Sequence, residues 1–596
     1  MNKSVLGTLV RQIGTYRWAA VATPVLTALE TVADVLIPYE TALLIDRGLS
    51  VGSMPDVWKY GALMLLLAFL SLLLGVTAGR VSAYASTGFA ANLRSAIYDR
   101  IQTFSFANID RFTTSGLVTR MTTDVQSLQS AFQQIMRVTV RAPFRLLLSV
   151  MMCLVINPHL SLIFVVALLV LGLCLYLIIS RAAGLFRQVF AQYDALNLRV
   201  QENVQGIRVV KAFVREEHEN SKFETAAEGL YRLYTRAERL MALNHPVMNL
   251  VMYGCIIALS WWGAHFVVGG TLTTGQLTSL FTYIMSILQA LMMLSMIFVM
   301  LTQSAASAQR VCEVLHEEPD IVNPKHPLMQ VTDGSLEFRN VRFDYGGADG
   351  WQKSRRSALY NVSFSIRSGE TIGIVGGTGS GKSTLVNLVS RLYDPRGGEV
   401  LVGGHDVKEY DLEVLRNAVS VVLQHNTLFS GSVLDNLRWG RSDASLEECQ
   451  WACRLAQADE FVSEMPEGYE TRIEQDGVNV SGGQKQRLCI ARALLKRPRI
   501  LVLDDSTSAC DTATDARIQR AFREELPGVT KIIIAQRISS VCLCDRILVM
   551  DNGVVSGFDT HEELLRTNDL YREICALQNA DKGDFDVPQT EKGGEG

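Results

Sequence analysis

The chain has 596 residues, of which 48% are hydrophobic and 19% are charged, and its formal net charge is −4. This length exceeds what one compact core accommodates, so we expect at least two domains. The slightly negative charge excludes a protein that binds nucleic acid through a basic surface, and we expect no nucleic-acid partner.

The first half of the chain contains six apolar segments long enough to cross a membrane. A spanning helix needs roughly 20 mainly apolar residues. The run at 61–76 has no polar face, which excludes the buried helices of a large soluble protein. The segment from Trp18 has no small-residue cleavage site, so we interpret it as a membrane helix and not as a signal peptide. The six predicted spans are 18–45, 58–83, 136–156, 159–181, 246–268 and 277–301.

Lysine and arginine are concentrated in two long connectors, which join the second span to the third and the fourth span to the fifth. The connectors between spans three and four and between spans five and six contain neither residue. The first long connector carries Arg94, Arg100, Arg111 and Arg120. By the positive-inside rule, both long connectors and both termini are cytoplasmic. We therefore predict a multi-pass protein of the plasma membrane.

Two carboxylates, Glu30 and Asp34, lie one helical turn apart inside the first predicted span. Ionisable groups within spans are expensive, and they suggest by default a functional site that faces a cavity. Cation binding or selection is one hypothesis for the pair. A structural hydrogen bond to a neighbouring span, near the kink expected at Pro38, is the alternative, and the sequence does not decide between them.

The sixth predicted span is rich in methionine, and Met292 and Met296 are two of its five methionines. Flexible, polarizable side chains suit surfaces that accept varied apolar ligands. Met292 and Met296 are therefore candidate ligand contacts. The alternative is that the stripe serves helix packing, which is the more common use of methionine at helical spacing.

The sequence pattern changes near Gly334 to short apolar strands, glycine-rich turns and amphipathic helices. This pattern is typical of a doubly wound α/β domain. The residues after about 579 are polar, and we expect them to be disordered. The predicted organisation is an all-α transmembrane domain over 1–318, a linker over 319–333, an α/β domain over 334–578 and a tail over 579–596.

A complete phosphate-binding loop follows the apolar strand predicted at 371–375 and leads into a helix. This arrangement directs backbone N–H groups and the positive end of the helix dipole at phosphates. Lys382 is expected to reach the β- and γ-phosphates, and the Ser383 hydroxyl is expected to bind Mg²⁺. The predicted nucleotide-binding residues here are Gly376, Gly377, Thr378, Gly379, Ser380, Gly381, Lys382, Ser383 and Thr384. The predicted fold class is thus a six-helix transmembrane domain followed by an α/β P-loop nucleotide-binding domain.

Asp504 ends a buried strand predicted at 500–504, and we expect its carboxylate to hold the same Mg²⁺. A second anion-binding helix start precedes this strand by about twenty residues, in the sequence Ser-Gly-Gly-Gln. One chain rarely needs two triphosphate sites, unless the second serves the nucleotide of a neighbouring subunit. The residues predicted to contact that nucleotide are Ser481, Gly482, Gly483 and Gln484.

With these motifs, the chain resembles an ABC transporter half-subunit of the exporter type over about residues 15 to 578. In that family, two ATP molecules lie between two nucleotide-binding domains. Each ATP is held by the phosphate loop of one domain and the signature of the other. The resemblance therefore implies ATP and Mg²⁺ as cofactors and a homologous half-transporter as partner.

The resemblance also implies roles for residues outside these two motifs. Tyr345 would stack on adenine, and Gln424 would sense Mg²⁺ and the membrane domain. Asp511 would lie in a loop that crosses the dimer interface. Ala107–Phe112 and Val204–Lys211 would be the coupling helices at the tips of the two cytoplasmic loops.

Two positions of the catalytic site depart from the family pattern, because Asp505 replaces the catalytic glutamate and Gln536 replaces the switch histidine. Shortening the carboxylate by one methylene displaces it by about 1.5 Å, and a misplacement of ~1 Å can cost ~10²-fold in rate. Glutamine can hydrogen-bond the γ-phosphate but cannot carry charge. We therefore predict a site that binds ATP and hydrolyses it slowly. Neutral drift, with Asp505 as an adequate base, is the alternative.

The signature is intact, whereas a homodimer would contain two impaired catalytic sites. A heterodimer, in which the partner supplies a competent glutamate and histidine, is the simpler explanation. The chain most resembles the degenerate-site subunit of bacterial heterodimeric exporters, which often export multiple drugs. This implies ATP-driven export of hydrophobic or amphipathic compounds, with Glu30, Asp34, Met292 and Met296 as candidate substrate contacts. A lipid or peptide exporter, an importer with the exporter fold and a regulatory subunit without its own transport pathway remain alternatives.

Overall fold

The computed structural model describes residues 3–345, 358–424, 426–506 and 510–580. The chain divides into two compact units, which comprise residues 1–102 with 114–317 and residues 103–113 with 318–596. The predicted tail lies outside the described residues from position 581 on. Its first two positions are helical, because the last helix ends at Ala580.

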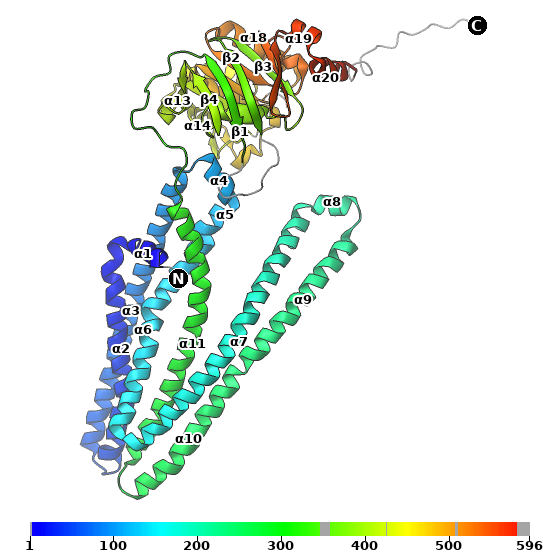
Figure 1. Cartoon of the computed structure of the whole chain (residues 1–596). Helices are drawn as coiled ribbons and strands as arrows, with labels where there is room; N and C mark the ends of the chain where they lie inside the picture. Colours follow the sequence, from blue (N-terminus) through cyan, green and yellow to red (C-terminus); the bar gives the residue numbers. More distant parts are fainter. Residues whose placement is uncertain (1–2, 346–357, 425, 507–509, 581–596) are drawn as a thin grey trace. The chain divides into compact units, whose positions relative to one another are not determined.

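The first unit is built from helices (Figure 1). They are α1 (Lys3–Arg11), α2 (Arg17–Leu43), α3 (Met54–Gln102), α5 (Thr114–Thr119), α6 (Val125–Ile156), α7 (Pro158–Gln205), α8 (Ile207–Ala212), α9 (Glu216–Ala242), α10 (Asn244–Val268) and α11 (Thr274–His316). Among the described residues, six helical segments are long and apolar enough to cross a membrane, which confirms the six predicted spans. Helix α2 packs along α3, α11 packs along α6, and α7 packs along α9 with α8 at the tip of the hairpin.

Local capping explains the sharp turns between consecutive spans. The Asn157 side chain accepts hydrogen bonds from the backbone N–H groups of His159 and Leu160, and Pro158 occupies the first turn of α7. Thr273 and Gln276 form a capping box at the start of α11. Both arrangements satisfy N–H groups that have no partner within the helix, so the chain can reverse direction within a few residues.

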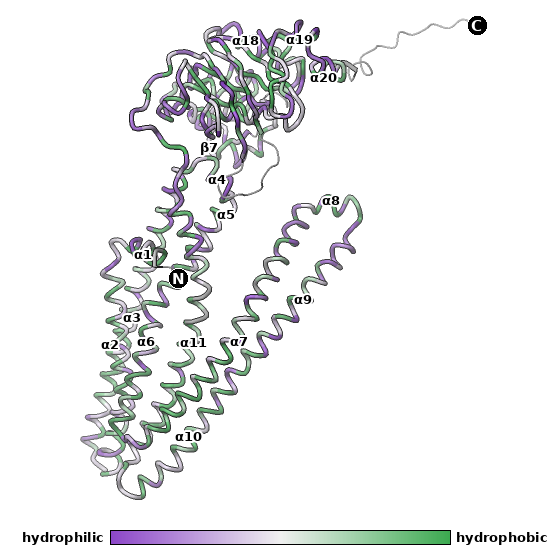
Figure 2. The backbone as a smooth tube through the Cα atoms, viewed as in Figure 1, coloured by the Kyte–Doolittle hydropathy of each residue, from purple (hydrophilic) through white to green (hydrophobic). Residues whose placement is uncertain are grey.

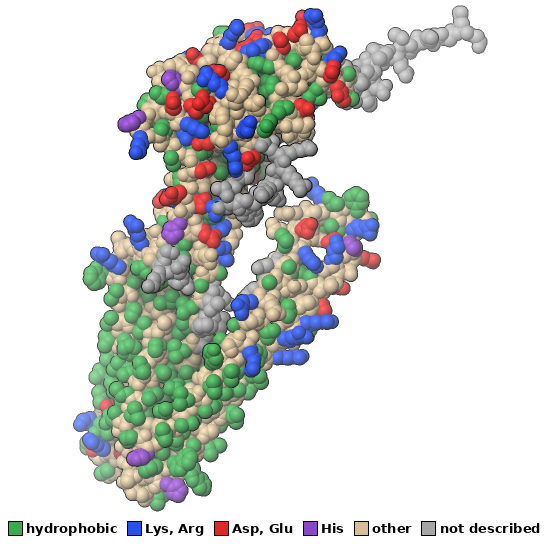
Figure 3. Space-filling model, viewed as in Figure 1, with side chains coloured by type: hydrophobic (Ala, Val, Ile, Leu, Met, Phe, Trp, Pro, Cys, Tyr) green, Lys and Arg blue, Asp and Glu red, His purple; other side chains and the backbone are tan. Residues whose placement is uncertain are grey.

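The hydrophobic surface of the first unit follows the spans. Figure 2 shows apolar residues along the lower parts of α7 and α10 and more hydrophilic residues toward α8. Figure 3 shows hydrophobic side chains gathered over the same spanning parts. Leu65, Leu169 and Leu250 are among the exposed apolar side chains. Such a surface is stable only where lipid replaces water, because apolar area in water is unfavourable.

The second unit contains a six-stranded sheet and a four-stranded sheet, as expected for the predicted α/β domain. The larger sheet has the order β12 (Val554–Asp559), β11 (Arg546–Asp551), β3 (Thr371–Gly376), β10 (Thr530–Ile534), β9 (Ile500–Asp504) and β6 (Val419–Val422). It is parallel except for β12. The smaller, antiparallel sheet has the order β2 (Leu359–Ile366), β1 (Leu336–Phe343), β4 (Gly397–Val402) and β5 (His405–Asp406). A short pair joins β7 (Gly431–Ser432) to β8 (Arg472–Ile473).

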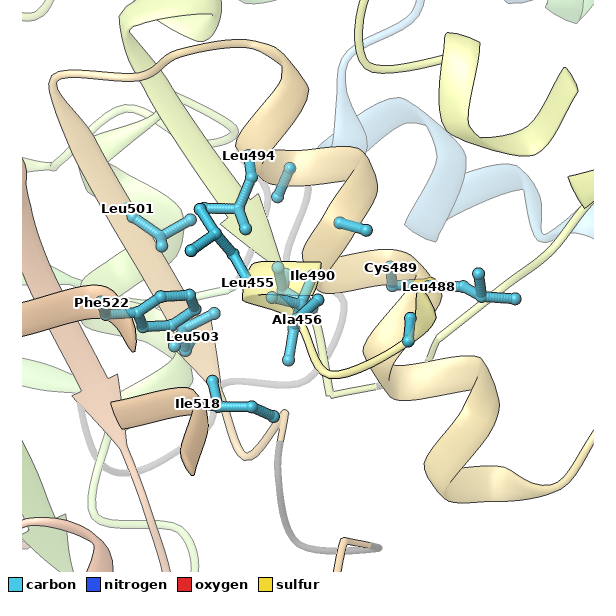
Figure 4. Packing of buried hydrophobic residues seen from close by; sticks show 14 of the residues in the cluster. Leu455, Ala456, Leu488, Cys489, Ile490, Leu494, Leu501, Leu503, Ile518 and Phe522 are labelled. Atoms are coloured by element: carbon cyan, nitrogen blue, oxygen red, sulfur yellow. The ribbon is translucent and has the colours of Figure 1, made fainter. Parts of the chain in front are cut away.

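Ten helices accompany these strands in the described part of the second unit. They are α4 (Phe106–Phe112), α12 (Lys382–Val389), α13 (Leu412–Ala418), α14 (Val433–Arg438), α15 (Leu446–Leu455), α16 (Asp459–Glu464), α17 (Gly482–Leu495), α18 (Thr512–Glu525), α19 (His561–Thr567) and α20 (Asp569–Ala580). Leu494 of α17, Leu501 and Leu503 of β9 and Ile518 of α18 belong to one hydrophobic core (Figure 4). This core fixes the helix that carries the signature to the strand that carries Asp504.

The strand register places three chemically important segments at one edge of the larger sheet. Ile534 at the end of β10 pairs with Ile374 of β3 on one side and with Asp504 of β9 on the other. The carboxyl ends of parallel strands meet at the same edge, where open α/β sheets bind ligands. The phosphate loop, the predicted Mg²⁺ carboxylate and the segment that follows β10 are therefore neighbours.

Helix α4 comes from the first long connector, yet it packs within the second unit. The Tyr393 hydroxyl donates a hydrogen bond to Asp110 Oδ2 at 2.6 Å, and the rings of Phe106 and Tyr393 lie 6.1 Å apart. Asn108 Nδ2 donates to the Glu318 carbonyl oxygen at 3.3 Å. This helix overlaps the first predicted coupling segment, whereas α8, in the first unit, overlaps the second.

Candidate nucleotide-binding site

The phosphate loop has a backbone that requires glycine. Gly376, Gly379 and Gly381 have φ values of 152°, 78° and 98°, which side chains rarely tolerate. A Cβ atom on Gly376 would lie 2.2 Å from the Met550 carbonyl oxygen. A Cβ atom on Gly377 or Gly379 would meet no other atom of the described residues within 4 Å, so these two glycines leave the loop backbone open for close contact with a phosphate.

The Lys382 ammonium lies inside this loop. Its Nζ atom donates hydrogen bonds to the carbonyl oxygens of Gly376 and Gly377, both at 2.8 Å. Burial lowers the pKa of Lys382, and the charges of Asp504 and Asp505 act in the opposite direction. The ammonium therefore lies against the carbonyl oxygens of the loop, and a bound phosphate would offer it a charged acceptor in their place.

A hydroxyl and a carboxylate adjoin at the end of β9, as a magnesium site requires. Asp504 is buried, and the Ser383 side chain hydrogen-bonds its carboxylate. Burial raises the pKa of Asp504, and the Ser383 hydrogen bond opposes this effect. Oxygen ligands of these types suit Mg²⁺, which also keeps waters and binds substrate phosphates. The residues therefore fit the predicted ion, and Ser383 and Asp504 would hold it.

The two departures from the family pattern contact each other. Gln536 Nε2 donates a hydrogen bond to Asp505 Oδ2 at 2.8 Å, and the Gln424 side chain also hydrogen-bonds the Asp505 carboxylate. Burial raises the pKa of Asp505, while the hydrogen bond from Gln536 and the charge of Lys382 oppose the increase. Asp505 has a φ of 50°, a left-handed conformation that aspartate tolerates better than most residues. The structure thus brings Gln424, Asp505 and Gln536 together.

Tyr345 lies beside the helix that follows the phosphate loop. Its hydroxyl is 3.0 Å from Thr384 Oγ1, and its ring meets those of Phe343 and Tyr393 edge-on. The Tyr345 side chain is 52% exposed. An exposed ring at this position can accept an adenine on its face, as predicted for Tyr345.

The signature forms the start of α17. Ser481 Oγ accepts a hydrogen bond from the Gln484 N–H, and Gln484 Oε1 accepts one from the Ser481 N–H at 2.9 Å. This capping box orders the first turn, while Ser481 and Gly482 stay exposed. An exposed, ordered helix N-terminus can bind an anion from a second molecule.

The interface loop predicted around Asp511 adjoins the signature. The Cys510 sulfur lies 4.0 Å from the Gly483 carbonyl oxygen. Asp511 caps α18 through hydrogen bonds from the N–H and the hydroxyl of Thr514, both at 2.8 Å. These bonds hold the pKa of Asp511 below its ordinary value. Residues 507–509 of the loop lie outside the described residues.

The carboxylates of the first span have a partner that the sequence analysis missed. Arg141 of α6 lies 3.2 Å from Glu30 Oε1 and 2.9 Å from Asp34 Oδ2, and Ser71 Oγ donates to Asp34 Oδ1 at 2.5 Å. The sequence did contain a signal for this partner, because Arg141 is a basic residue inside the span predicted at 136–156. Of the two predicted methionine contacts, Met292 is half-buried, and Met296 is 72% exposed.

Two parts of the chain match known families. Residues 21–292 match the family described as ABC transporter transmembrane region. Residues 359–508 match the family described as ABC transporter. The first match contains spans two to five and most of spans one and six, and the second contains the phosphate loop, the signature and Asp504.

Similarity to individual proteins extends over nearly the whole chain. It is 35% identical over 559 residues to the uncharacterized ABC transporter ATP-binding protein YfiB of Bacillus subtilis, which covers 94% of this chain and 96% of that protein. It is 32% identical to the ATP-dependent lipid A-core flippase of Syntrophus aciditrophicus, over 82% of this chain and 80% of that protein. The solved structure of a bacterial Atm1-family ABC exporter with ATP bound has a TM-score of 0.77 at 25% identity, covering 99% of this chain and all of that one. The chain therefore belongs to the ABC transporter family, as an exporter-type half-transporter whose ATP-binding domain couples ATP hydrolysis to transport.

Proposed function

We propose that this chain is the degenerate-site half of a heterodimeric exporter for hydrophobic or amphipathic compounds, of the multidrug type. Its own phosphate loop, with Mg²⁺ on Ser383, Asp504 and Gln424, binds ATP and turns it over slowly. The hydrogen bond between Gln536 and Asp505 is the observation that carries this proposal. This bond links the two catalytic-site positions that depart from the family pattern, a neutral amide at 536 and a carboxylate at 505.

The chemistry of that pair favours binding over hydrolysis. A general base must lie within hydrogen-bond reach of the proton that it removes, directly or through one water. The Asp505 side chain is one methylene shorter than a glutamate side chain, and one of its carboxylate oxygens already accepts a hydrogen bond from Gln536. The Gln536 amide cannot become cationic, so it stabilises developing phosphate charge less than a histidinium.

The intact signature supports a partner with a competent site. In this proposal, a homologous half-transporter supplies a catalytic glutamate and a switch histidine. Its ATP binds against Ser481–Gln484 of this chain. ATP binding closes the two domains, the coupling helices transmit the closure to the spans, and hydrolysis at the competent site resets the transporter.

The transported class is proposed from the membrane unit. Its helices α2 and α6 contain a charged cluster of Glu30, Asp34 and Arg141. Helix α11 carries the methionines Met292 and Met296. A cationic, apolar compound could contact both kinds of side chain. Lipid export is a second candidate, because one relative is named as a lipid A-core flippase. Peptide export, import and a purely regulatory role are the remaining alternatives.

We also propose that the protein lies in the plasma membrane with both termini on the cytoplasmic side. The arginines of the first long connector support this orientation. Single cysteines placed at the tip of α8 and in the turn before α11, in a chain without other accessible thiols, would test it. A membrane-impermeant thiol reagent added to intact cells should label the turn and not α8.

ATP turnover by the purified full-length chain tests the proposed degenerate site. The wild type is compared with an Asp505→Glu/Gln536→His variant, and ATP binding is measured in both. The same variant with an additional Asp504→Asn substitution is the control, and it should be inactive. We expect very slow turnover in the wild type and at least tenfold faster turnover in the double variant. Wild-type turnover of roughly 1 s⁻¹ or more would overturn the proposal and favour a working homodimer.

A further inference from the structure

We propose that Gln578, near the end of the C-terminal helix α20, is a positioning residue for the nucleotide site. It holds the backbone of the segment that follows β10, and this segment carries Gln536. Through that segment, Gln578 sets the position of the Gln536 side chain relative to Asp505. The proposal rests on the proposed function only for its effect on turnover.

The contact is a double hydrogen bond from one side-chain amide. Gln578 Oε1 accepts from the backbone N–H of Ile538 at 2.7 Å, and Gln578 Nε2 donates to the Gln536 carbonyl oxygen at 2.6 Å. The amide therefore bridges the backbone on both sides of Arg537. Position 536 lies beyond the end of β10 at Ile534, so its carbonyl lies outside the strand ladder. A side chain from another element supplies its partner instead.

Helix α20 is itself anchored, so the Gln578 amide is fixed before any nucleotide binds. Tyr571 and Cys575 are buried in the same hydrophobic core as Leu501 and Leu503 of β9. Residues 571, 575 and 578 follow helical spacing on one face, and this face meets the domain. The Tyr571 hydroxyl lies 2.7 Å from His561 Nδ1, which holds α20 against α19.

The anchored helix is connected to the catalytic carboxylate by a short chain of contacts. Gln578 holds the Gln536 backbone, and the Gln536 side chain donates to Asp505 Oδ2 at 2.8 Å. A second backbone contact supports the carboxylate, because the Asp505 N–H donates to the Ile534 carbonyl oxygen at 3.0 Å. Without Gln578, the segment from 536 to 538 loses two hydrogen bonds that limit its motion. The residue at position 536 then spends less time in contact with the residue at 505.

Two substitutions separate the hydrogen bonds, and a third serves as a control. Gln578→Ala removes both bonds. Gln578→Glu keeps an acceptor for the Ile538 N–H and loses the donor to the Gln536 carbonyl. Leu577→Ala changes the adjacent side chain, which is exposed, and should leave the segment unaffected.

The first measurement is hydrogen exchange of the backbone amides in the full-length chain, because it does not depend on hydrolysis. We expect exchange at Ile538 to be about tenfold faster in Gln578→Ala, in line with the loss of one to two hydrogen bonds. Gln578→Glu should protect Ile538 better than Gln578→Ala, and Leu577→Ala should match the wild type. Equal exchange at Ile538 in wild type and Gln578→Ala would overturn the proposal. Faster exchange throughout α20 would also overturn it, because Gln578 would then serve only to dock the helix.

The second measurement is ATP turnover in the Asp505→Glu/Gln536→His background. If Gln578 positions residue 536, Gln578→Ala should lower kcat several-fold and leave KM unchanged, and Gln578→Glu should have an intermediate effect. An equal decrease of kcat in Leu577→Ala would contradict a positioning role, and so would a change in KM without a change in kcat. Failure of the background variant to hydrolyse ATP would count against the proposed function alone, since the exchange measurement still decides the role of Gln578.

Discussion

Gln536 Nε2 and Asp505 Oδ2 lie 2.8 Å apart, although 31 positions separate the two residues in the chain. Their strands β10 and β9 are parallel neighbours, and Ile534 pairs with Asp504 at the end of the register. Each residue follows its strand by one or two positions. The hydrogen bond therefore follows from the sheet topology, and it makes the two replaced residues one structural unit.

Because the two residues touch, their substitutions should not be additive. We expect Asp505→Glu alone and Gln536→His alone each to raise turnover only slightly. In each single variant, the new side chain still contacts the residue that departs from the family pattern at the other position. The double variant should exceed the product of the two single effects by about tenfold, as is typical of residues in contact. The rate of phosphate release at saturating Mg²⁺ and ATP measures the turnover of the wild type, the two single variants and the double variant. Additive effects would mean that the hydrogen bond has no influence on catalysis.

The hydrogen bond from Tyr393 to Asp110 should contribute to coupling. Tyr393→Phe removes the hydroxyl and keeps the ring, so the packing against Phe106 is preserved. We expect substrate-stimulated ATP turnover of the assembled transporter to fall several-fold, while basal turnover stays near the wild-type value. Asp110→Asn keeps an acceptor oxygen and is the matched control. Loss of both activities would indicate that Tyr393 stabilises the fold and has no specific coupling role.

Removal of Arg141 should destabilise the membrane unit. Arg141→Leu leaves the buried Glu30 carboxylate and the partly buried Asp34 carboxylate without their cation, and breaking a buried pair in this way costs about 3–5 kcal/mol. Thermal unfolding in detergent should show a clearly lower Tm. The neutral set Glu30→Gln/Asp34→Asn/Arg141→Gln should recover most of the loss, because neither carboxylate then remains without its cation.

The same variants address the role of the cluster in transport. A neutral set that is stable and still transports cationic compounds would assign Glu30 and Asp34 to structure. A neutral set that is stable and still transports uncharged compounds, but no longer transports cationic ones, would assign Glu30 and Asp34 to substrate selection.

The ion pair between Glu370 and Arg546 predicts a dependence of stability on pH. Burial disfavours ionisation of Glu370. The hydrogen bonds from Arg546, at 2.5 and 2.7 Å, the hydrogen bond from the Arg367 N–H, at 2.8 Å, and the charges of both arginines together outweigh burial, so the pKa of Glu370 lies below its ordinary value. The pair therefore contributes stability above the unfolded-state pKa of about 4.3, and this stability is lost as pH falls through the lower folded-state pKa.

Glu370→Gln tests this dependence. The variant should be less stable than the wild type by about 1–3 kcal/mol at pH 7, as for hydrogen bonds to charged groups. Denaturant unfolding of both proteins between pH 7 and pH 3 measures the difference, which should shrink at the acidic end. A difference that is constant over this range would show that Glu370 stays protonated or that Arg546 does not stabilise its charge.

The sequence by itself determined the six spans, the phosphate loop of Gly376–Ser383, the signature of Ser481–Gln484 and the strand that ends at Asp504. These features depend on local order: an apolar run of sufficient length, glycines where the backbone turns, and a capping serine at a helix start. They also placed the chain in its family, and from the family pattern followed the two unusual residues Asp505 and Gln536.

Only the tertiary structure decided which distant residues meet. It paired Arg141 with Glu30 and Asp34 across α2 and α6, it brought Gln536 to Asp505, and it placed Gln578 on the Gln536 backbone. It also packed α4, from the first long connector, against Tyr393. No periodicity or motif encodes these contacts, because each depends on how strands order in a sheet or how helices pack. The geometry of side chains separated by tens or hundreds of positions follows from that packing alone.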